Sequence, residues 1–199
     1  MRLLRFIAVL LHPIVIPTLV TLCYFLMVPI YFASEQKLAI ITLIFLTTYL
    51  IPVLFVFLFK RLGVLTNYDQ TSLNERKLPV LVMLVLFFMI GKTLFVIPNF
   101  RDLGALYYSS AAALAFVYFL SFFRIKVSLR LVAMGIAVGF FLHLNSYYSR
   151  SFLILIVLSI LLSGFLSSAL LYFKAENEKE IYFGFFIGIF ASLLFSNFL

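Results

Sequence analysis

The sequence predicts an all-α fold: a polytopic membrane helical bundle of six to seven transmembrane helices, with residues 1–199 forming a single integral membrane domain. Hydrophobic residues make up 65% of the chain, charged residues only 11%, and the mean hydropathy is +1.21. Soluble domains carry about 25% charged residues, so a soluble core does not explain this composition. Several apolar stretches are each about as long as the ~20 residues that a membrane-spanning helix needs.

The expected spans follow one another with short polar breaks, at roughly residues 7–32, 38–59, 79–98, 104–122, 127–145, 151–173 and 181–198. The first stretch is overlong and contains Pro13, Pro17 and Pro29, so we expect an interfacial helix that leads into a kinked span. Its basic start resembles a secretory signal, but no small-residue cleavage site follows, and we interpret it as a retained helix.

Small and special residues support the later spans. Pro79 is expected in the first turn of the third span, a position that favours proline. Pairs of small residues four apart let membrane helices approach closely. The sequence has three such pairs: Gly135 with Gly139, Gly184 with Gly188, and Gly164 with Ser168. They predict close packing among the last three spans.

Seven spans would place the two chain ends on opposite sides of the membrane. Side X then holds the N-terminus and the segments 60–78, 123–130 and 174–180, and side Y holds 33–37, 99–103 and 144–150. The basic residues on side X are Arg2, Arg5, Lys60, Arg61, Arg76, Lys77, Arg124, Lys126, Arg130, Lys174 and Lys179; those on side Y are Lys37, Arg101 and Arg150. The positive-inside rule makes side X, with the N-terminus, cytoplasmic in a cell membrane, which we expect to be a bacterial inner membrane.

Three polar elements face side X: "NERKLP" at 74–79, "RIKVSLR" at 124–130 and "SSALLYFKAENEKE" at 167–180. An Arg with a nearby Pro opens one helix, and a segment with a Ser opens the helix after next. The third element lies two spans later and is followed by glycines four and eight residues on. The order of these elements, over roughly residues 60–190, resembles the type 2 phosphatidic acid phosphatase family.

That family carries the motifs Lys-x6-Arg-Pro, Pro-Ser-Gly-His and Ser-Arg-x5-His-x3-Asp. In this sequence Arg76 or Lys77 stands near the first-motif Arg, with the following Pro displaced. Ser128 matches the second-motif Ser, and Arg130 replaces its His. In the third motif Glu180 stands at the Asp and Glu176 at the nucleophilic His.

The resemblance implies removal of phosphate from membrane lipids by one nucleophilic and one proton-donating histidine. Arg130 does not donate a proton near neutral pH, because the pKa of arginine lies above about 12. Glu176 could in principle form an acyl phosphate, but nothing else in the sequence supports that step. His12 lies in the first span and His143 at the side Y end of the fifth. We therefore predict a non-catalytic protein with a lipid-phosphatase-like scaffold; the alternative is a diverged lipid phosphate phosphatase acting at the basic interfacial site.

The predicted site is a basic cluster on side X. Lys126 and Arg130 are four residues apart at a helix start, where the helix dipole also favours anions. One alternative is a cradle for an anionic headgroup phosphate; the other, slightly favoured, is pairing with acidic residues as a salt-bridge cluster. The residues concerned are Arg76, Lys77, Arg124, Lys126, Ser128, Arg130, Glu176 and Glu180.

Other functions receive little support. Two histidines and the single Cys23 make a structural zinc site improbable, so no metal and no cofactor is predicted. The basic residues form no nucleic-acid-binding pattern. Lys92 lies within a span, where a charge is either functional or, as we favour, extends toward side Y. A small transporter would need more mid-membrane polar residues. The expected partners are membrane lipids, anionic lipids among them, and other membrane protein subunits.

Overall fold

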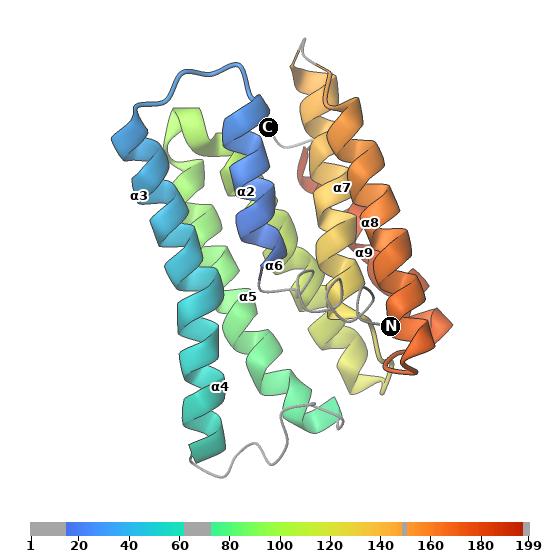
Figure 1. Ribbon diagram of the computed structural model, residues 1–199. Coiled ribbons are helices and arrows are strands. Elements are labelled where there is room, and N and C mark those ends of the chain that lie inside the picture. Colours follow the sequence, from blue (N-terminus) through green and yellow to red (C-terminus); the bar gives the residue numbers. More distant parts are fainter. Residues whose placement is uncertain (1–14, 62–72, 149–150, 197–199) are drawn as a thin grey trace.

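The structure is a computed structural model, and it describes residues 15–61, 73–148 and 151–196. Within these ranges every regular element is a helix, which confirms the all-α class, and the helices lie side by side in one bundle (Figure 1). The elements are α2 (Ile16–Met27), α3 (Ser34–Phe45), the π-helical η1 (Leu46–Leu50), α4 (Ile51–Arg61), α5 (Leu73–Phe95), the 3-10 turn η2 (Pro98–Phe100), α6 (Arg101–Phe122), α7 (Leu129–Tyr147), α8 (Leu153–Tyr172) and α9 (Glu178–Ser196).

Five helical stretches in the described ranges are long and apolar enough to cross a membrane: Ser34–Phe59, Lys77–Phe95, Pro98–Phe122, Leu129–Tyr147 and Leu153–Tyr172. These five support integration of the chain into a membrane. The described part of the first predicted span, α2, has 12 residues, or about 18 Å of helix. The last, α9, has 19 residues and begins with Glu178, Lys179 and Glu180.

Prolines account for two departures from the predicted boundaries. Helix α2 ends at Met27, five residues before the predicted end, and Val28 is extended, with φ −68° and ψ 132°. The residue before a proline disfavours the α conformation, and Pro29 follows Val28. Pro79 lies inside α5 and not in its first turn, because the polar residues before it are also helical and α5 begins at Leu73.

A π turn interrupts the second span. It covers Leu46–Leu50 between α3 and α4, so one extra residue is accommodated without ending the helix. Thr48 is fully buried there; its hydroxyl donates to the carbonyl of Ile44 at 2.8 Å and lies 3.2 Å from the hydroxyl of Thr18 in α2. The π turn thus places a polar contact between α2 and the second span.

Helices α7 and α9 run in the same direction with their backbones in contact. A Cβ atom built on Gly135 would lie closer than 3.0 Å to the Phe185 carbonyl oxygen, and one on Gly188 equally close to that of Val132. Gly139 faces Ser192 in the same way. Gly164 differs: it is exposed on α8 and a Cβ there would meet nothing within 4 Å, so the Gly164–Ser168 pair makes no close helix contact among the described residues.

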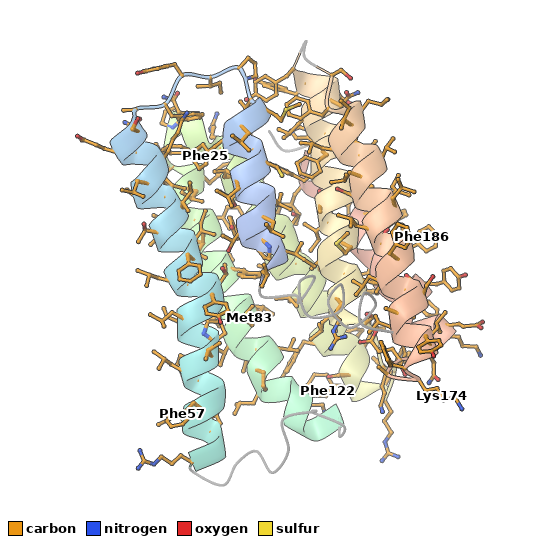
Figure 2. All side chains as sticks on the ribbon, viewed as in Figure 1. Phe25, Phe57, Met83, Phe122, Lys174 and Phe186 are labelled. Atoms are coloured by element: carbon orange, nitrogen blue, oxygen red, sulfur yellow. The ribbon has the colours of Figure 1, made fainter. Side chains whose placement is uncertain are left out.

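The connections fall at two opposite ends of the bundle (Figure 1). One end holds the start of α5 and the connections α6–α7 and α8–α9, as expected for side X. The other end holds the connections α2–α3, α5–α6 and α7–α8, as expected for side Y. The side chains of Phe122 and Lys174 lie at the side X end, and that of Phe25 lies toward side Y (Figure 2).

Candidate functional site

The cations of the predicted site come from three separate parts of the fold. Lys77 lies near the start of α5, Arg124 and Lys126 lie in the α6–α7 connection, and Arg130 is the second residue of α7. Arg124 and Lys126 are exposed, whereas Lys77 and Arg130 are partly buried. The backbone of Arg76 belongs to α5, and its side chain falls outside what the structure describes.

The two described connections on side X, α6–α7 and α8–α9, begin with the same backbone turn. After α6, the amide of Ile125 donates to the Leu120 carbonyl and that of Arg124 to the Ser121 carbonyl; after α8, Ala175 donates to Leu170 and Lys174 to Leu171. This pattern is the Schellman motif, whose left-handed position usually holds glycine. Here that position holds a cation each time, since φ is 59° at Arg124 and 52° at Lys174.

Ser128 joins the starts of α7 and α9. It is fully buried, its amide donates to the Glu180 carbonyl at 3.0 Å, and its hydroxyl accepts from the Leu131 amide at 3.2 Å. Its hydroxyl therefore caps α7, and its backbone ties the two predicted motifs together.

Replacing Ser128 with alanine is expected to lower the free energy of unfolding by about 1 kcal/mol, because the Leu131 amide loses its cap. Thermal unfolding in detergent measures the loss. Ser168→Ala is the matched control: its exposed hydroxyl bonds only to the Gly164 carbonyl one turn earlier. An equal loss in both variants would show that the cap has no special role.

The acidic residues of side X do not pair with these cations in the part of the chain that the structure describes, where no carboxylate lies within the 4.0 Å ion-pair distance of Arg124, Lys126 or Arg130. Glu180 instead accepts from the Asn177 amide group at 3.2 Å. Glu176 is partly buried, and its Oε2 is enclosed without a hydrogen-bond partner. The salt-bridge alternative is thus not realised among these residues.

A small cleft brings two of the predicted cations together. Lys77 from α5 and Lys126 from the α6–α7 connection both line it, with apolar walls from Val80, Val117, Ile125 and Val127. The cleft also includes Tyr118 and Ser121 on the last turns of α6. The enclosed part of the cleft is small, about 20 Å³.

The lysine on α5 also contacts an aromatic ring. The Nζ of Lys77 lies over the ring of Phe122, 4.7 Å from its centroid. Such a cation–π contact stabilises an exposed ammonium by about 0.5–1 kcal/mol. The contact joins Lys77 to Phe122, the last residue of α6, whose ring is itself exposed.

Side Y holds a polar cluster that sequence reasoning missed. Asp102, in the first turn of α6, is buried, and its Oδ2 accepts from the hydroxyls of Tyr148 at 2.5 Å and Tyr24 at 3.3 Å. Burial, with the hydrogen bond and charge of Asp102, raises the pKa of Tyr148, so this phenol remains a donor at neutral pH. The one available signal was a carboxylate in the short polar break before an apolar stretch.

Helix α2 makes further hydrogen-bonding contacts to its neighbours through polar side chains on the face that carries Tyr24. Thr21 is buried, and its hydroxyl lies 3.1 Å from that of Tyr107 in α6. Thr18, Thr21 and Tyr24 are spaced three residues apart and each contacts a different polar group. Hydrogen bonds of this kind hold membrane helices together.

The remaining predicted residues lie outside these two sites. Lys92 is exposed near the side Y end of α5. His143 lies near the side Y end of α7, with its Nε2 enclosed and unbonded, and His12 lies outside the described residues. Within the described ranges no three His, Cys, Asp or Glu side chains are grouped to hold a metal ion.

No protein-family model, no curated protein and no solved structure matches the chain. Any functional conclusion therefore depends on the residues and their geometry.

Proposed function

We propose that the protein is a non-catalytic membrane protein with a lipid-phosphatase-like scaffold, and that it binds the phosphate of an anionic lipid headgroup at side X. The observation that supports this most is the cleft in which Lys77 and Lys126 converge on apolar walls. Lys77 belongs to α5 and Lys126 to the α6–α7 connection, so the fold, and not local sequence, brings them together.

The chemistry of the cleft suits a phosphate attached to an apolar tail. Two ammonium groups can each donate to phosphate oxygens while neutralising their charge. The valines and Ile125 on the walls match the less polar glycerol and acyl portions of a lipid at the level of the membrane surface. Arg124 is exposed on the same connection as Lys126 and adds positive charge to it.

The residues at the motif positions argue against hydrolysis. Arg130 lacks a proton to donate near neutral pH, and Glu176 stands where the resembled family has its nucleophilic histidine. His143 lies toward the other end of α7, about 21 Å of helix from Leu129. A diverged phosphatase would need another acid and base at side X, and it would release phosphate from phosphatidic acid.

The same proposal includes the setting of the protein. The excess of Lys and Arg on side X supports an orientation in which that side, with the N-terminus, faces the cytoplasm, and the proposed setting is a bacterial inner membrane. Anionic lipids of a cytoplasmic leaflet attract basic segments with about 1 kcal/mol per Lys or Arg, so this orientation presents the cleft to its ligand. Work as a subunit of a membrane complex is compatible with headgroup binding.

The double substitution Lys77→Ala with Lys126→Ala is expected to weaken binding of phosphatidylglycerol about 30-fold, since each lysine contributes about 1 kcal/mol. Native mass spectrometry of the purified protein, titrated with phosphatidylglycerol or phosphatidylcholine, measures bound lipid. Lys37→Ala with Lys92→Ala removes equal charge at side Y and is the control. Equal weakening by both double variants would mean diffuse attraction and would end the proposal.

Phosphate release from phosphatidic acid is measured on the same preparations. We expect none above the level of a preparation without the protein. Release that disappears in Glu176→Ala would instead establish the diverged phosphatase.

A further inference from the structure

Helices α6 and α8 end at side X with the same order of residue types. In each, the last helical residue is aromatic, the C-cap is aromatic and a cation follows. The two triplets, here named the aromatic–cation ends, are Phe122, Phe123 and Arg124, and Tyr172, Phe173 and Lys174. The C-caps have nearly equal dihedral angles, φ −85° and ψ 10° at Phe123 and φ −82° and ψ 1° at Phe173. Figure 2 shows Phe122 and Lys174, one from each triplet, at the same end of the bundle.

The cation of each aromatic–cation end occupies a backbone conformation that disfavours it. Arg124, with φ 59°, and Lys174, with φ 52°, are the only non-glycine residues with positive φ in the described ranges. Glycine adopts this left-handed conformation freely and usually fills the position, whereas other L residues lose stability there. The negative end of the helix dipole favours a cation and offsets part of the loss. A turn with a structural role alone would therefore favour glycine over a cation.

The side chains of both ends point away from the protein interior. Arg124 and Lys174 are exposed, and so are the rings, with Phe123 63% and Tyr172 55% exposed. Exposed aromatic rings at the ends of membrane helices lie at the level of the lipid headgroups. The cation that directly follows such rings is within reach of lipid phosphates, because long cationic side chains extend to that level.

The charges around the two cations differ. The α6–α7 connection contains Lys126 besides Arg124 and has no carboxylate. In the α8–α9 connection Glu176 follows Lys174 by two residues, and α9 begins with Glu178, Lys179 and Glu180. The end that contains Arg124 therefore attracts an anion more strongly than the end that contains Lys174.

We propose that the aromatic–cation ends are two binding sites for anionic lipid at side X. In each, the aromatic rings hold the helix end at the headgroup level, and the guanidinium or ammonium group donates hydrogen bonds to a lipid phosphate. The sites are separate from the cleft of Lys77 and Lys126, because neither Arg124 nor Lys174 lines it, although the ring of Phe122 contacts Lys77.

The double substitution Arg124→Gly with Lys174→Gly separates lipid binding from folding. In an uncharged detergent without added lipid, glycine relieves the backbone at both positions, so the midpoint of thermal unfolding should rise by about 2–4 °C for each position. Phosphatidylglycerol should raise the midpoint of the natural chain more than phosphatidylcholine does, because a ligand of the folded state stabilises it. In the double variant this extra rise should fall by about half or more, with most of the loss already present in Arg124→Gly alone.

Two control variants isolate the cause. Arg124→Lys keeps a charge in the same left-handed position and should keep the extra rise with phosphatidylglycerol. Arg61→Gly removes an exposed cation from the last residue of α4, where the backbone is helical, and should lower the midpoint without lipid. A rise in Arg61→Gly as large as that in the double variant would attribute the effect to lost charge and would count against the proposed sites.

Three other results would overturn the proposal. A lower midpoint of the double variant without lipid would mean that the cations serve the helix ends. An unchanged extra rise with phosphatidylglycerol would mean that they bind no lipid, and loss of that rise in Arg124→Lys would mean that charge is not what binds. Lys77→Ala with Lys126→Ala tests the cleft separately: a normal extra rise in that variant would count against the cleft and leave the two lipid sites in place.

Discussion

Gly188→Ala is expected to lower the free energy of unfolding by about 3 kcal/mol, although the change adds a single methyl group. That methyl would lie closer than 3.0 Å to the Val132 carbonyl oxygen and the Ile136 amide nitrogen, both backbone atoms of α7. A backbone inside a helix does not move aside as a flexible side chain does, so α7 and α9 must separate. Thermal unfolding in detergent, followed by the loss of helical circular dichroism, measures the change.

Gly164→Ala is the matched control for this prediction. The substitution is identical and also falls within an apolar helix, but no atom lies within 4 Å of the added methyl. Alanine favours the helix by about 1 kcal/mol over glycine, so Gly164→Ala should stabilise slightly or have no effect. Effects of the same sign and size in both variants would contradict backbone contact between α7 and α9.

Phe152→Ala is expected to destabilise the protein by about 3 kcal/mol, because it removes a fully buried ring at the start of α8. This ring packs near Tyr148, and the Phe152 amide donates to the side-chain oxygen of Asn145 at 2.9 Å. The described contacts of α8 are mainly with α7, so few others replace the lost ring.

Phe165→Ala tests whether burial is the cause. Phe165 lies on the same helix and is 53% exposed. Its replacement by alanine should lower the free energy of unfolding by less than about 0.5 kcal/mol. Both variants are unfolded with sodium dodecyl sulfate in mixed micelles, and the midpoints are compared. Similar midpoints for the two variants would mean that Phe152 does not anchor α8.

Much of the fold could be predicted because apolar length determines where a membrane helix forms. The stretches expected at 127–145 and 151–173 became Leu129–Tyr147 and Leu153–Tyr172, and α9 formed at the short last stretch, expected at 181–198. Boundaries were less accurate where polar residues continued a helix, as before Pro79 in α5. The π turn at Leu46–Leu50 left no recognisable pattern in the sequence.

The candidate site was predictable in composition but not in geometry. The sequence indicated that Lys77 and Lys126 share a side, and only the packing of α5 against α6 shows that they line one cleft. Ser128 was expected at the site and is instead buried as a helix cap. The Asp102 cluster was missed because Tyr24, Asp102 and Tyr148 lie 46 or more residues apart along the chain.

The contact between α7 and α9 has a consequence for how the protein is made. Gly135 and Gly188 meet in the finished bundle, yet about 50 residues separate them, including the whole of α8. At roughly 5–20 residues per second, a ribosome needs about 3–10 s to deliver the second glycine after the first. During that interval α7 has entered the bilayer with its glycine surface uncovered, so the newly made chain depends on lipid or on the insertion machinery to shield that surface until α9 arrives.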